Sequence, residues 1–249
     1  MRSARIGTAG WGIPSAVAAA FPGGESLLER YGRVFDAVEV NSTFRRVHRR
    51  ETFERWAGSV GADFRFSVKV PKAITHEARL HGVERPLETL LAATAGLGAN
   101  LGPLLVQLPP SLVFDAAVFD IFRGRLRDLG DPALACEPRH ASWFEPWVDD
   151  WLADRRIARV AADPALHPRA VAPGGWRGLS YYRLHGSPKV YYTPYNADAL
   201  AALKERLARD EAGSVWCMFD NTASGAATSN ALALKAALQQ APRAEESAR

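Results

Sequence analysis

Charged and amide side chains stand at the ends of short apolar segments throughout this chain of 249 residues. Successive side chains of an extended segment point to opposite faces, so Glu39 and Asn41 share one face while Val38 and Val40 share the other. The same reasoning collects a polar set of Glu39, Asn41, Lys69, Gln107, Glu137, Arg139, Arg183 and His185, with Asp163 after the sixth segment and Asp220 or Asn221 after the eighth. Carboxylates, a histidine and cations in one place are the groups that acid–base catalysis on an anion requires.

Eight apolar segments carry these residues, and most are separated by enough chain for a helix. They span residues 5–8, 37–41, 65–70, 104–108, 134–137, 157–161, 179–184 and 214–219. Strands that alternate with helices form parallel sheets, and eight such units in about 250 residues predict an α/β fold, a single (β/α)8 TIM-type barrel. The outer face of such a barrel packs on helices and must be apolar, so we expect the polar set to point into the upper mouth.

Helix signals fill most of the gaps between these segments. A capping box at Ser26 and Glu29 and several amphipathic patterns predict helices over residues 26–35, 50–60, 86–97, 115–129, 144–155, 197–209 and 230–238. The stretch 164–178 is rich in Pro and Gly and has no helical period, which predicts that the sixth crossover helix is reduced or missing. We expect one barrel domain over residues 1–241 and a frayed C-terminal tail over 242–249.

The composition is that of an ordinary globular domain with a mild basic bias. Hydrophobic residues make up 47% of the chain and charged residues 23%, and the net charge is +4. Both cysteines, Cys136 and Cys217, fall inside predicted strands and are expected to be buried thiols. The chain shows no signal-peptide pattern and no apolar run of about 18 residues, which predicts a cytoplasmic protein without a membrane partner. The oligomeric state has no sequence signal.

The charges of the polar set would also be compatible with a purely structural role. Glu137 with Arg139 and Asp163 with Arg183 would then form internal salt bridges. Burying many ion pairs is costly, however, and apolar layers would fill a barrel at lower cost. We therefore interpret the polar mouth as a ligand site.

Three hypotheses describe what such a site would do. In the first, an acid–base enzyme (a hydrolase, lyase or isomerase of unknown substrate and cofactor) acts on an anionic small molecule, phosphorylated or not. Its candidate catalytic residues are Glu137, Asp163, His185 and Lys69. In the second, strand-end carboxylates bind a divalent metal; the neighbouring cations would repel it, and no metal site is assigned. In the third, the mouth binds a ligand without chemistry.

Loops after the strands add candidate binding residues. The segment 220–230, DNTASGAATSN, runs into a predicted helix start, where barrels often hold phosphate on backbone N–H groups. The Tyr-rich loop 189–195 and the sequence RRVHRR at 45–50 favour a rival function, a protein that binds or processes nucleic acid. The candidate substrate-binding residues are Glu39, Asn41, Thr43, Gln107, Arg139, Arg183, Tyr192, Asp220, Asn221 and Gly225.

Seven motifs occur in order along nearly the whole chain. They are GTAGWG at 7–12, VEVNSTF at 38–44, FRFSVKVPKAITH at 64–76, GPLLVQLPPS at 102–111, CEPRHASW at 136–143, YYRLHG at 181–186 and FDNTASGAATSNA at 219–231. The set resembles domain-of-unknown-function family 72, and the resemblance implies a TIM-type barrel and no established reaction. Two departures stand out: the first loop lacks the family's Trp and Tyr, which alters one wall of the site, and Asp220 replaces an Asn, which adds negative charge and strengthens the metal hypothesis.

Overall fold

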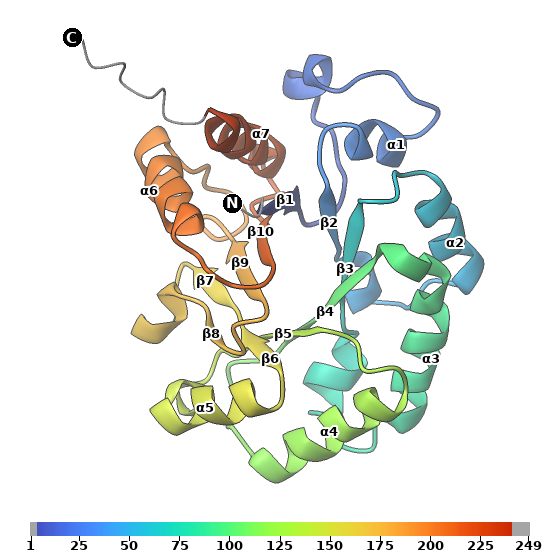
Figure 1. Ribbon diagram of the computed structural model, residues 1–249, viewed down its shortest axis with the longest axis vertical. Coiled ribbons are helices and arrows are strands. Elements are labelled where there is room, and N and C mark those ends of the chain that lie inside the picture. Colours follow the sequence, from blue (N-terminus) through green and yellow to red (C-terminus); the bar gives the residue numbers. More distant parts are fainter. Residues whose placement is uncertain (1–3, 241–249) are drawn as a thin grey trace, which may run out of the picture.

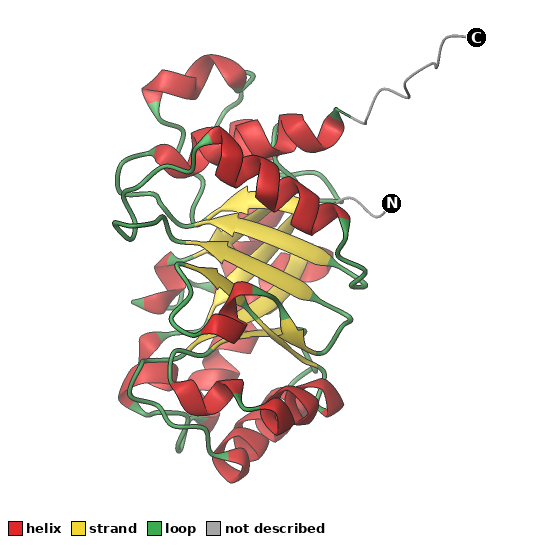
Figure 2. Cartoon of the chain, turned by 90° about the vertical axis from the view of Figure 1, so that its left-hand side faces the viewer, coloured by secondary structure: helices red, strands yellow, loops and turns green. Residues whose placement is uncertain are grey.

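A computed structural model of the chain describes residues 4–240, with strands at the centre and helices around them (Figure 1; Figure 2). The strands are β1 Arg5–Thr8, β2 Ala37–Val40, β3 Arg65–Lys69, β4 Leu101–Gln107, β5 Leu134–Glu137, β6 Ile157–Arg159, β7 Ala161–Asp163, β8 Gly174–Gly175, β9 Ser180–Leu184 and β10 Val215–Phe219. The α-helices are α1 Leu27–Gly32, α2 Arg50–Gly58, α3 Glu84–Thr94, α4 Ala116–Asp128, α5 Pro146–Asp154, α6 Ala197–Ala208 and α7 Ala226–Gln239. Each of the eight predicted apolar segments contains a strand, which confirms the α/β class.

Parallel pairing follows the chain order in two sheets. One sheet has the order β1-β10-β9-β7 and the other β2-β3-β4-β5-β6-β8. The sheets meet at two places: Ala9, just after β1, forms an isolated parallel bridge with Glu39 of β2, and Val160 alone separates β6 from β7. The Val160 amide still donates to the Cys136 carbonyl at 2.8 Å. The predicted TIM-type arrangement is confirmed, with its sixth strand divided into two short pieces.

The sixth crossover differs from the others, as predicted. Between β7 and β9 the chain forms the 3₁₀ turn η6 Pro168–Val171 and the two-residue strand β8, which pairs antiparallel with β6. Short 3₁₀ helices also follow several strands or helices: η1 Ser15–Ala20, η2 Ser42–Phe44, η4 Ala95–Asn100 and η5 Ala141–Phe144. The turn after β3, η3 Ala73–Glu77, is a π-helix.

Local signals explain where the helices begin. The Ser26 hydroxyl accepts a hydrogen bond from the Glu29 amide at 3.1 Å, which caps α1 as predicted, and Asp115 caps α4. The predicted start of the last helix at residue 230 is wrong, since α7 begins at Ala226. Gly225 takes a left-handed conformation with φ 78°, which sets the turn and lets the small residues after it enter the helix.

Strand alternation produces two apolar clusters. Val38, Val40 and Leu184 belong to the outer cluster that packs against the helices, as predicted. The inner cluster fills the barrel towards the N-terminal ends of the strands and consists of Ala37, Leu105, Ala135, Ala158, Val160, Leu179, Tyr181, Trp216 and Met218. Inward positions recur every two residues, so the layer above this apolar plug is the polar one.

No helix within residues 4–240 is long and apolar enough to cross a membrane. The predicted tail at 242–249 lies outside the described residues.

Candidate active site

The guanidinium of Arg183, on β9, lies at the centre of the polar layer and has no exposed surface. Its Nε and Nη2 donate to the two oxygens of Glu39 at 2.9 and 2.7 Å, and Nη2 also donates to Asp220 Oδ2 at 2.9 Å. Its Nη1 donates to Glu137 Oε2 at 2.6 Å and to Gln107 Oε1 at 3.2 Å. A guanidinium has five N–H donors, so every donor is used. Arg183 thus organises three carboxylates and, contrary to the expectation, has no donor left for a substrate anion.

Glu39 ties this network to the apolar plug below it. Its Oε2 accepts a hydrogen bond from the Tyr181 hydroxyl at 3.0 Å, and that hydroxyl lies 2.9 Å from Ser67 Oγ. Glu39 and Tyr181 are fully buried. Because its oxygens are occupied by Arg183 and Tyr181, Glu39 is a structural counter-ion and not a group that contacts substrate.

His185 lies between two carboxylates. Its Nδ1 is 3.0 Å from Asp220 Oδ2 and its Nε2 is 3.3 Å from Glu137 Oε1. Burial alone would lower the pKa of His185, but the charge of Glu137 and the hydrogen bonds to both carboxylates outweigh it and raise the pKa above its ordinary value. The two carboxylates therefore favour the protonated form of the imidazole.

Glu137, at the end of β5, is the most heavily contacted carboxylate. In addition to Arg183 and His185 it accepts hydrogen bonds on Oε1 from Nε and Nη2 of Arg139, at 3.1 and 2.8 Å. Burial would raise the pKa of Glu137, but the charges of Arg183 and His185 hold it well below its usual range. For Asp220, likewise, Arg183 overcomes the effect of burial and lowers the pKa. Both groups stay ionised at neutral pH, so of the two predicted catalytic residues Glu137 and His185, the histidine is the better proton donor.

Lys69, at the end of β3, is the cation of the cluster without a carboxylate partner. Its side chain is nearly buried, with 6% exposed, and its Nζ makes no hydrogen bond or ion pair within residues 4–240. The Nζ lies 4.3 Å from the centre of the Phe44 ring, which in turn packs edge-on against His76. Burial and then the charge of Arg183 lower the pKa of Lys69, and nearby carboxylates offset this only in part.

A small cavity of about 60 Å³ opens beside these groups. Glu137, Arg139 and His185 line it on one side, and apolar residues of the β7–β9 connection and the following loop complete it. The Tyr191 ring meets the His185 ring edge-on at 6.0 Å, and the Tyr191 amide donates to the His185 carbonyl. The loop after β9 therefore packs directly on the histidine and reaches the mouth of the barrel.

Four basic side chains share three carboxylates in this cluster. The basic groups are Lys69, Arg139, Arg183 and His185, and the acidic ones are Glu39, Glu137 and Asp220. Within residues 4–240, no three His, Cys, Asp or Glu side chains are placed to hold a metal ion. Glu39, Glu137 and Asp220 converge on the guanidinium of Arg183.

The structure does not place Asp163 in the cluster. In β7, Ala162 pairs with Arg183 and therefore shares its inward face, whereas Asp163 pairs with Leu184 on the outer face. The strand continues two residues beyond its predicted end, and the alternation from Val160 through Ala162 puts Asp163 outside. The prediction that Asp163 is a catalytic residue in the mouth is wrong for this geometric reason.

Three other predicted binding residues have structural partners. The Thr43 hydroxyl lies 2.8 and 2.6 Å from the carbonyls of Val40 and Lys69. Asn221, one residue past Asp220, turns outward and its Nδ2 donates to Thr193 O and Asn230 Oδ1. The Tyr192 ring is exposed and stacks with Lys189, so the loop residue that reaches the site is Tyr191 and not Tyr192.

Among the described residues, Gly225 and Asn41 make no hydrogen bond or ion pair with the charged cluster. Gly225 lines a separate cavity of about 320 Å³ between the N-terminus of α7 and the first loop, with Thr8, Gly10 and Thr228 among its walls. The first loop, which departs from the family pattern, forms one wall of this cavity through Gly12, Ile13 and Pro14. Asn41 follows β2, and its Oδ1 is buried with no hydrogen-bond partner among the described residues. Gln107 lies at the end of β4, and its Oε1 accepts a hydrogen bond from Arg183 Nη1.

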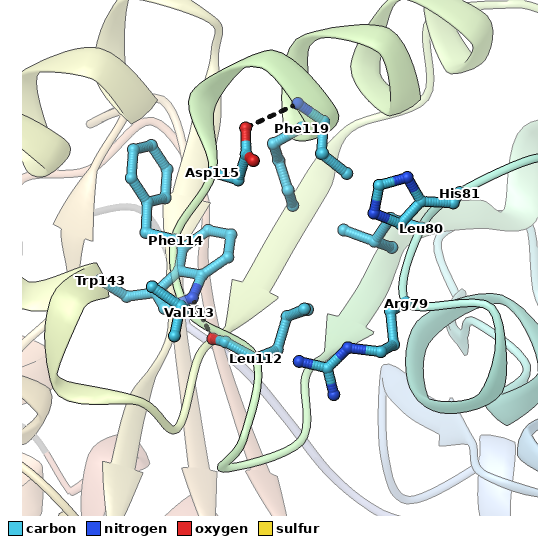
Figure 3. Close-up of a pocket in the computed structure, with 10 residues that line it drawn as sticks. Arg79, Leu80, His81, Leu112, Val113, Phe114, Asp115, Phe119 and Trp143 are labelled. Carbon is cyan, nitrogen blue, oxygen red and sulfur yellow. Dashed lines mark hydrogen bonds between the residues drawn. The ribbon is translucent and has the colours of Figure 1, made fainter.

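A further cavity, of about 230 Å³, lies outside the barrel between the η3–α3 connection and α4 (Figure 3). Leu80, Leu112, Phe119 and Trp143 contribute much of its wall. Two of its polar groups have structural roles: the Trp143 indole donates to the Leu112 carbonyl, and Asp115 caps α4 (Figure 3). It shares no lining residue with the charged cluster, which remains the candidate active site.

Sequence reasoning missed three aromatic contacts. Tyr181 has the same parity as Arg183 and His185, so the alternation rule could have placed it inside the barrel. Tyr191 belongs to the noted Tyr-rich loop, but no pattern says which ring turns inward. Phe44 lies in a 3₁₀ turn, and its contact with Lys69 has no sequence signal.

Replacing Lys69 with Met is expected to raise the free energy of unfolding by about 0.5–2 kcal/mol near neutral pH. The pKa of Lys69 is lower in the folded chain, so folding opposes its charged form below that pKa. This cost fades as the pH rises through the folded and then the unfolded pKa, and the gain should shrink in alkaline solution. Urea denaturation at neutral and alkaline pH measures this gain in unfolding free energy. Lys235→Met, which removes a lysine over the Phe35 ring at 5.9 Å, is the control. A clear loss of stability in Lys69→Met alone would identify Lys69 as a structural counter-ion.

Known proteins are similar in sequence to this chain over much or nearly all of its length. The UPF0759 protein YecE of Escherichia coli is 33% identical over 164 residues, which cover 64% of this chain and 58% of YecE. The match thus spans little more than half of that relative. The UPF0759 protein YunF of Bacillus subtilis is 24% identical over 257 residues, covering 90% of this chain and 91% of YunF.

Solved structures show the same fold. A DUF72 family protein of Enterococcus faecalis superposes with a TM-score of 0.80 at 21% identity, covering 96% of each chain. Another, of Thermotoga maritima, has a TM-score of 0.76 at 24% identity over 95% of this chain and 99% of that one. The 3-keto-D-glucoside 4-epimerase YcjR of Escherichia coli gives 0.54 at 15% identity over 96% and 100%. The model of the family described as "Protein of unknown function DUF72" matches residues 5–249, and the chain belongs to that family.

Proposed function

We propose that this protein is an enzyme that binds an anionic small molecule at the mouth of its barrel and transfers protons to or from it. The observation that carries the proposal is a pair of unused donors in the cluster: Nη1 of Arg139 and the amine of Lys69 make no hydrogen bond among the described residues. A preorganised cationic site favours charge that develops on a substrate oxygen.

Arg139 is the residue that we assign to binding the anion. Its Nε and Nη2 are held by Glu137, while its Nη1 has no partner among the described residues. The side chain is 21% exposed and lines the small cavity, so it can reach a ligand without leaving Glu137. The carboxylate of Glu137 therefore positions the guanidinium, and the free edge takes the substrate.

His185 is the candidate general acid. Its raised pKa favours the protonated ring, and Asp220 orients the ring through Nδ1. The longer contact of Nε2 with Glu137, 3.3 Å, is the one that a substrate oxygen at the cavity could replace. Lys69, whose pKa is lowered, is the candidate base that accepts a proton from the substrate.

Anion binding should appear as thermal stabilisation. Phosphate and a panel of small carboxylates are the probes, and a binding anion at about 100 times its Kd should raise the Tm by roughly 5–10 °C. The shift should shrink as salt rises. Arg139→Leu should lose this shift relative to its own Tm without anion. Arg209→Leu, at an exposed position just after α6, should keep the shift. If no anion stabilises the natural protein, the proposal fails.

One observation supports a second candidate function, nucleic-acid binding. Arg45, Arg46 and Arg49 are exposed after β2, at the mouth end of the barrel, and form no ion pair within residues 4–240. Such a rim would neutralise phosphates. Fluorescence anisotropy with a labelled oligonucleotide distinguishes this function, because the affinity would fall steeply with salt and would depend on these arginines and not on Lys69.

A further inference from the structure

Lys69 differs from the other lysines of the chain. There are five lysines, and the other four lie at Lys72, Lys189, Lys204 and Lys235. Lys72 is paired with Glu77, Lys204 contacts a backbone carbonyl, and Lys189 and Lys235 lie over aromatic rings outside the polar cluster. Lys69 is nearly buried inside the mouth, where Glu39, Glu137 and Asp220 are all committed to Arg183.

A lysine that only supplied charge would be expected to lie against a carboxylate. Here the Arg183 guanidinium takes that place, and the Lys69 amine faces the ring of Phe44. Arg139 nearby already supplies a fixed cation for an anion. What an amine adds to such a site, and a guanidinium cannot, is a nucleophilic nitrogen.

We propose that Lys69 is a nucleophile that forms an imine with an oxo acid, a substrate in which a carbonyl group adjoins a carboxylate. This inference rests on the proposed function and names its substrate class. The charge of Glu137 acts on the Lys69 amine, and the same carboxylate holds Arg139, so both cations belong to one charged layer. In the proposed complex, Arg139 binds the carboxylate and the adjoining carbonyl carbon is presented to Lys69. The burial and the neighbouring charge of Arg183, which lower the pKa of the amine, increase the share of the neutral form that can attack.

The step balances with the groups present. The lone pair of the neutral Lys69 nitrogen forms the C–N bond, the C=O π electrons move to oxygen, and one proton passes from nitrogen to that oxygen. The resulting carbinolamine takes a second proton from His185 on its hydroxyl group. Water leaves with the C–O bond, and the nitrogen lone pair forms the C=N bond of a protonated imine. No oxidant or reductant is needed, and the positive charge moves from the protonated His185 ring to the imine nitrogen of Lys69, which leaves His185 neutral.

Borohydride trapping tests this assignment. The full chain is incubated with pyruvate and sodium borohydride, which supplies hydride to reduce the imine to a stable secondary amine. Peptide mass spectrometry should place the adduct on Lys69 in preference to the other four lysines. Acetone, which lacks the carboxylate, should label poorly, and acetate, which lacks the carbonyl, should give no adduct but should protect Lys69 against pyruvate.

Two variants complete the experiment. Lys69→Arg keeps the charge and should lose the adduct, whereas Lys235→Arg should retain it. If pyruvate and glyoxylate both leave Lys69 unlabelled, or label all five lysines alike, the inference is overturned.

The anion-induced shift in Tm is measured on the same samples. A normal shift without an adduct removes only the imine step, and the absence of both removes the proposed function as well. Should Lys69→Arg fail to fold, protection of the natural protein by acetate decides the matter.

Discussion

Replacing Arg183 with Met is expected to lower the free energy of unfolding by about 3–5 kcal/mol, because it removes one member of a buried charge network. The guanidinium uses all five donors on Glu39, Glu137, Asp220 and Gln107. Met fills much of the same volume but leaves three carboxylates close together without their common cation. Their desolvation and mutual repulsion are then uncompensated, which is the costly way to break a buried ion pair.

Thermal and urea denaturation measure this loss, and for a chain of this size the Tm should fall on the order of 10 °C. Arg209→Met is the matched control, since Arg209 pairs with Glu205 on the surface with 80% of its side chain exposed. It should change stability by less than about 0.5 kcal/mol. Arg183→Lys keeps one charge but cannot make the five bonds, and it should lie between the two. A loss below about 1 kcal/mol in Arg183→Met would show that the network does not hold the barrel together.

The alternation rule predicted the central part of this site because strands repeat with a period of two. Arg183 and His185 are two residues apart, as are Glu137 and Arg139, and each pair lies on one face. The apolar partners Val38 and Leu184 pack outward as expected. The rule depends only on local geometry and on one buried face, and it holds without knowledge of the rest of the chain.

Two predicted site residues fall outside the mouth because the alternation rule was not applied beyond the predicted ends of their strands. Asp163 was placed by its position after the sixth segment and not by parity, and the strand in fact extends to it. Asn221 is one residue beyond Asp220, and a step of one residue reverses the face. Both errors arise from a single residue of register, which composition does not determine.

Other contacts need the whole fold. The hydroxyl of Tyr181 reaches Glu39 across 142 residues of sequence, and Arg183 meets Glu39 across 144. These partners are neighbours only because the strands curve around one axis, and no local pattern selects one carboxylate over another. Sequence parity predicts which residues face the mouth, whereas the choice of Arg183 as the centre follows from packing.

Replacing Glu137 with Gln is the second variant with a large expected effect, because the change removes the charge shared by three cations. Glu137 accepts hydrogen bonds from Arg139 and Arg183 and lies 3.3 Å from His185 Nε2. Gln has the same shape without the charge. We expect a loss of about 3–5 kcal/mol of unfolding free energy at neutral pH, and a fall in the pKa of His185.

The pH dependence gives the sign of both effects. The folded pKa of Glu137 is lowered, so its stabilisation is present above its unfolded pKa and is lost as the pH falls through the folded value. The folded pKa of His185 is raised, so its stabilisation is complete below its unfolded pKa of about 6.5 and is lost as the pH rises through the folded value. In Glu137→Gln, the acid loss should be smaller and the loss due to His185 should move to lower pH.

NMR titration of the histidine ring signals measures the pKa of His185 directly, with His185→Gln identifying its signal among the six histidines. Glu84→Gln is the control, since Glu84 lies on the surface 3.7 Å from Arg125 and should alter neither stability nor the histidine titration. The decisive comparison is between the two readouts. If stability falls in Glu137→Gln while His185 titrates as in the natural protein, Glu137 supports the fold alone. If His185 loses its proton at lower pH, Glu137 is the residue that keeps the candidate acid charged. Because Glu137 also holds Arg139, the same carboxylate then supports both the proton donor and the anion-binding residue.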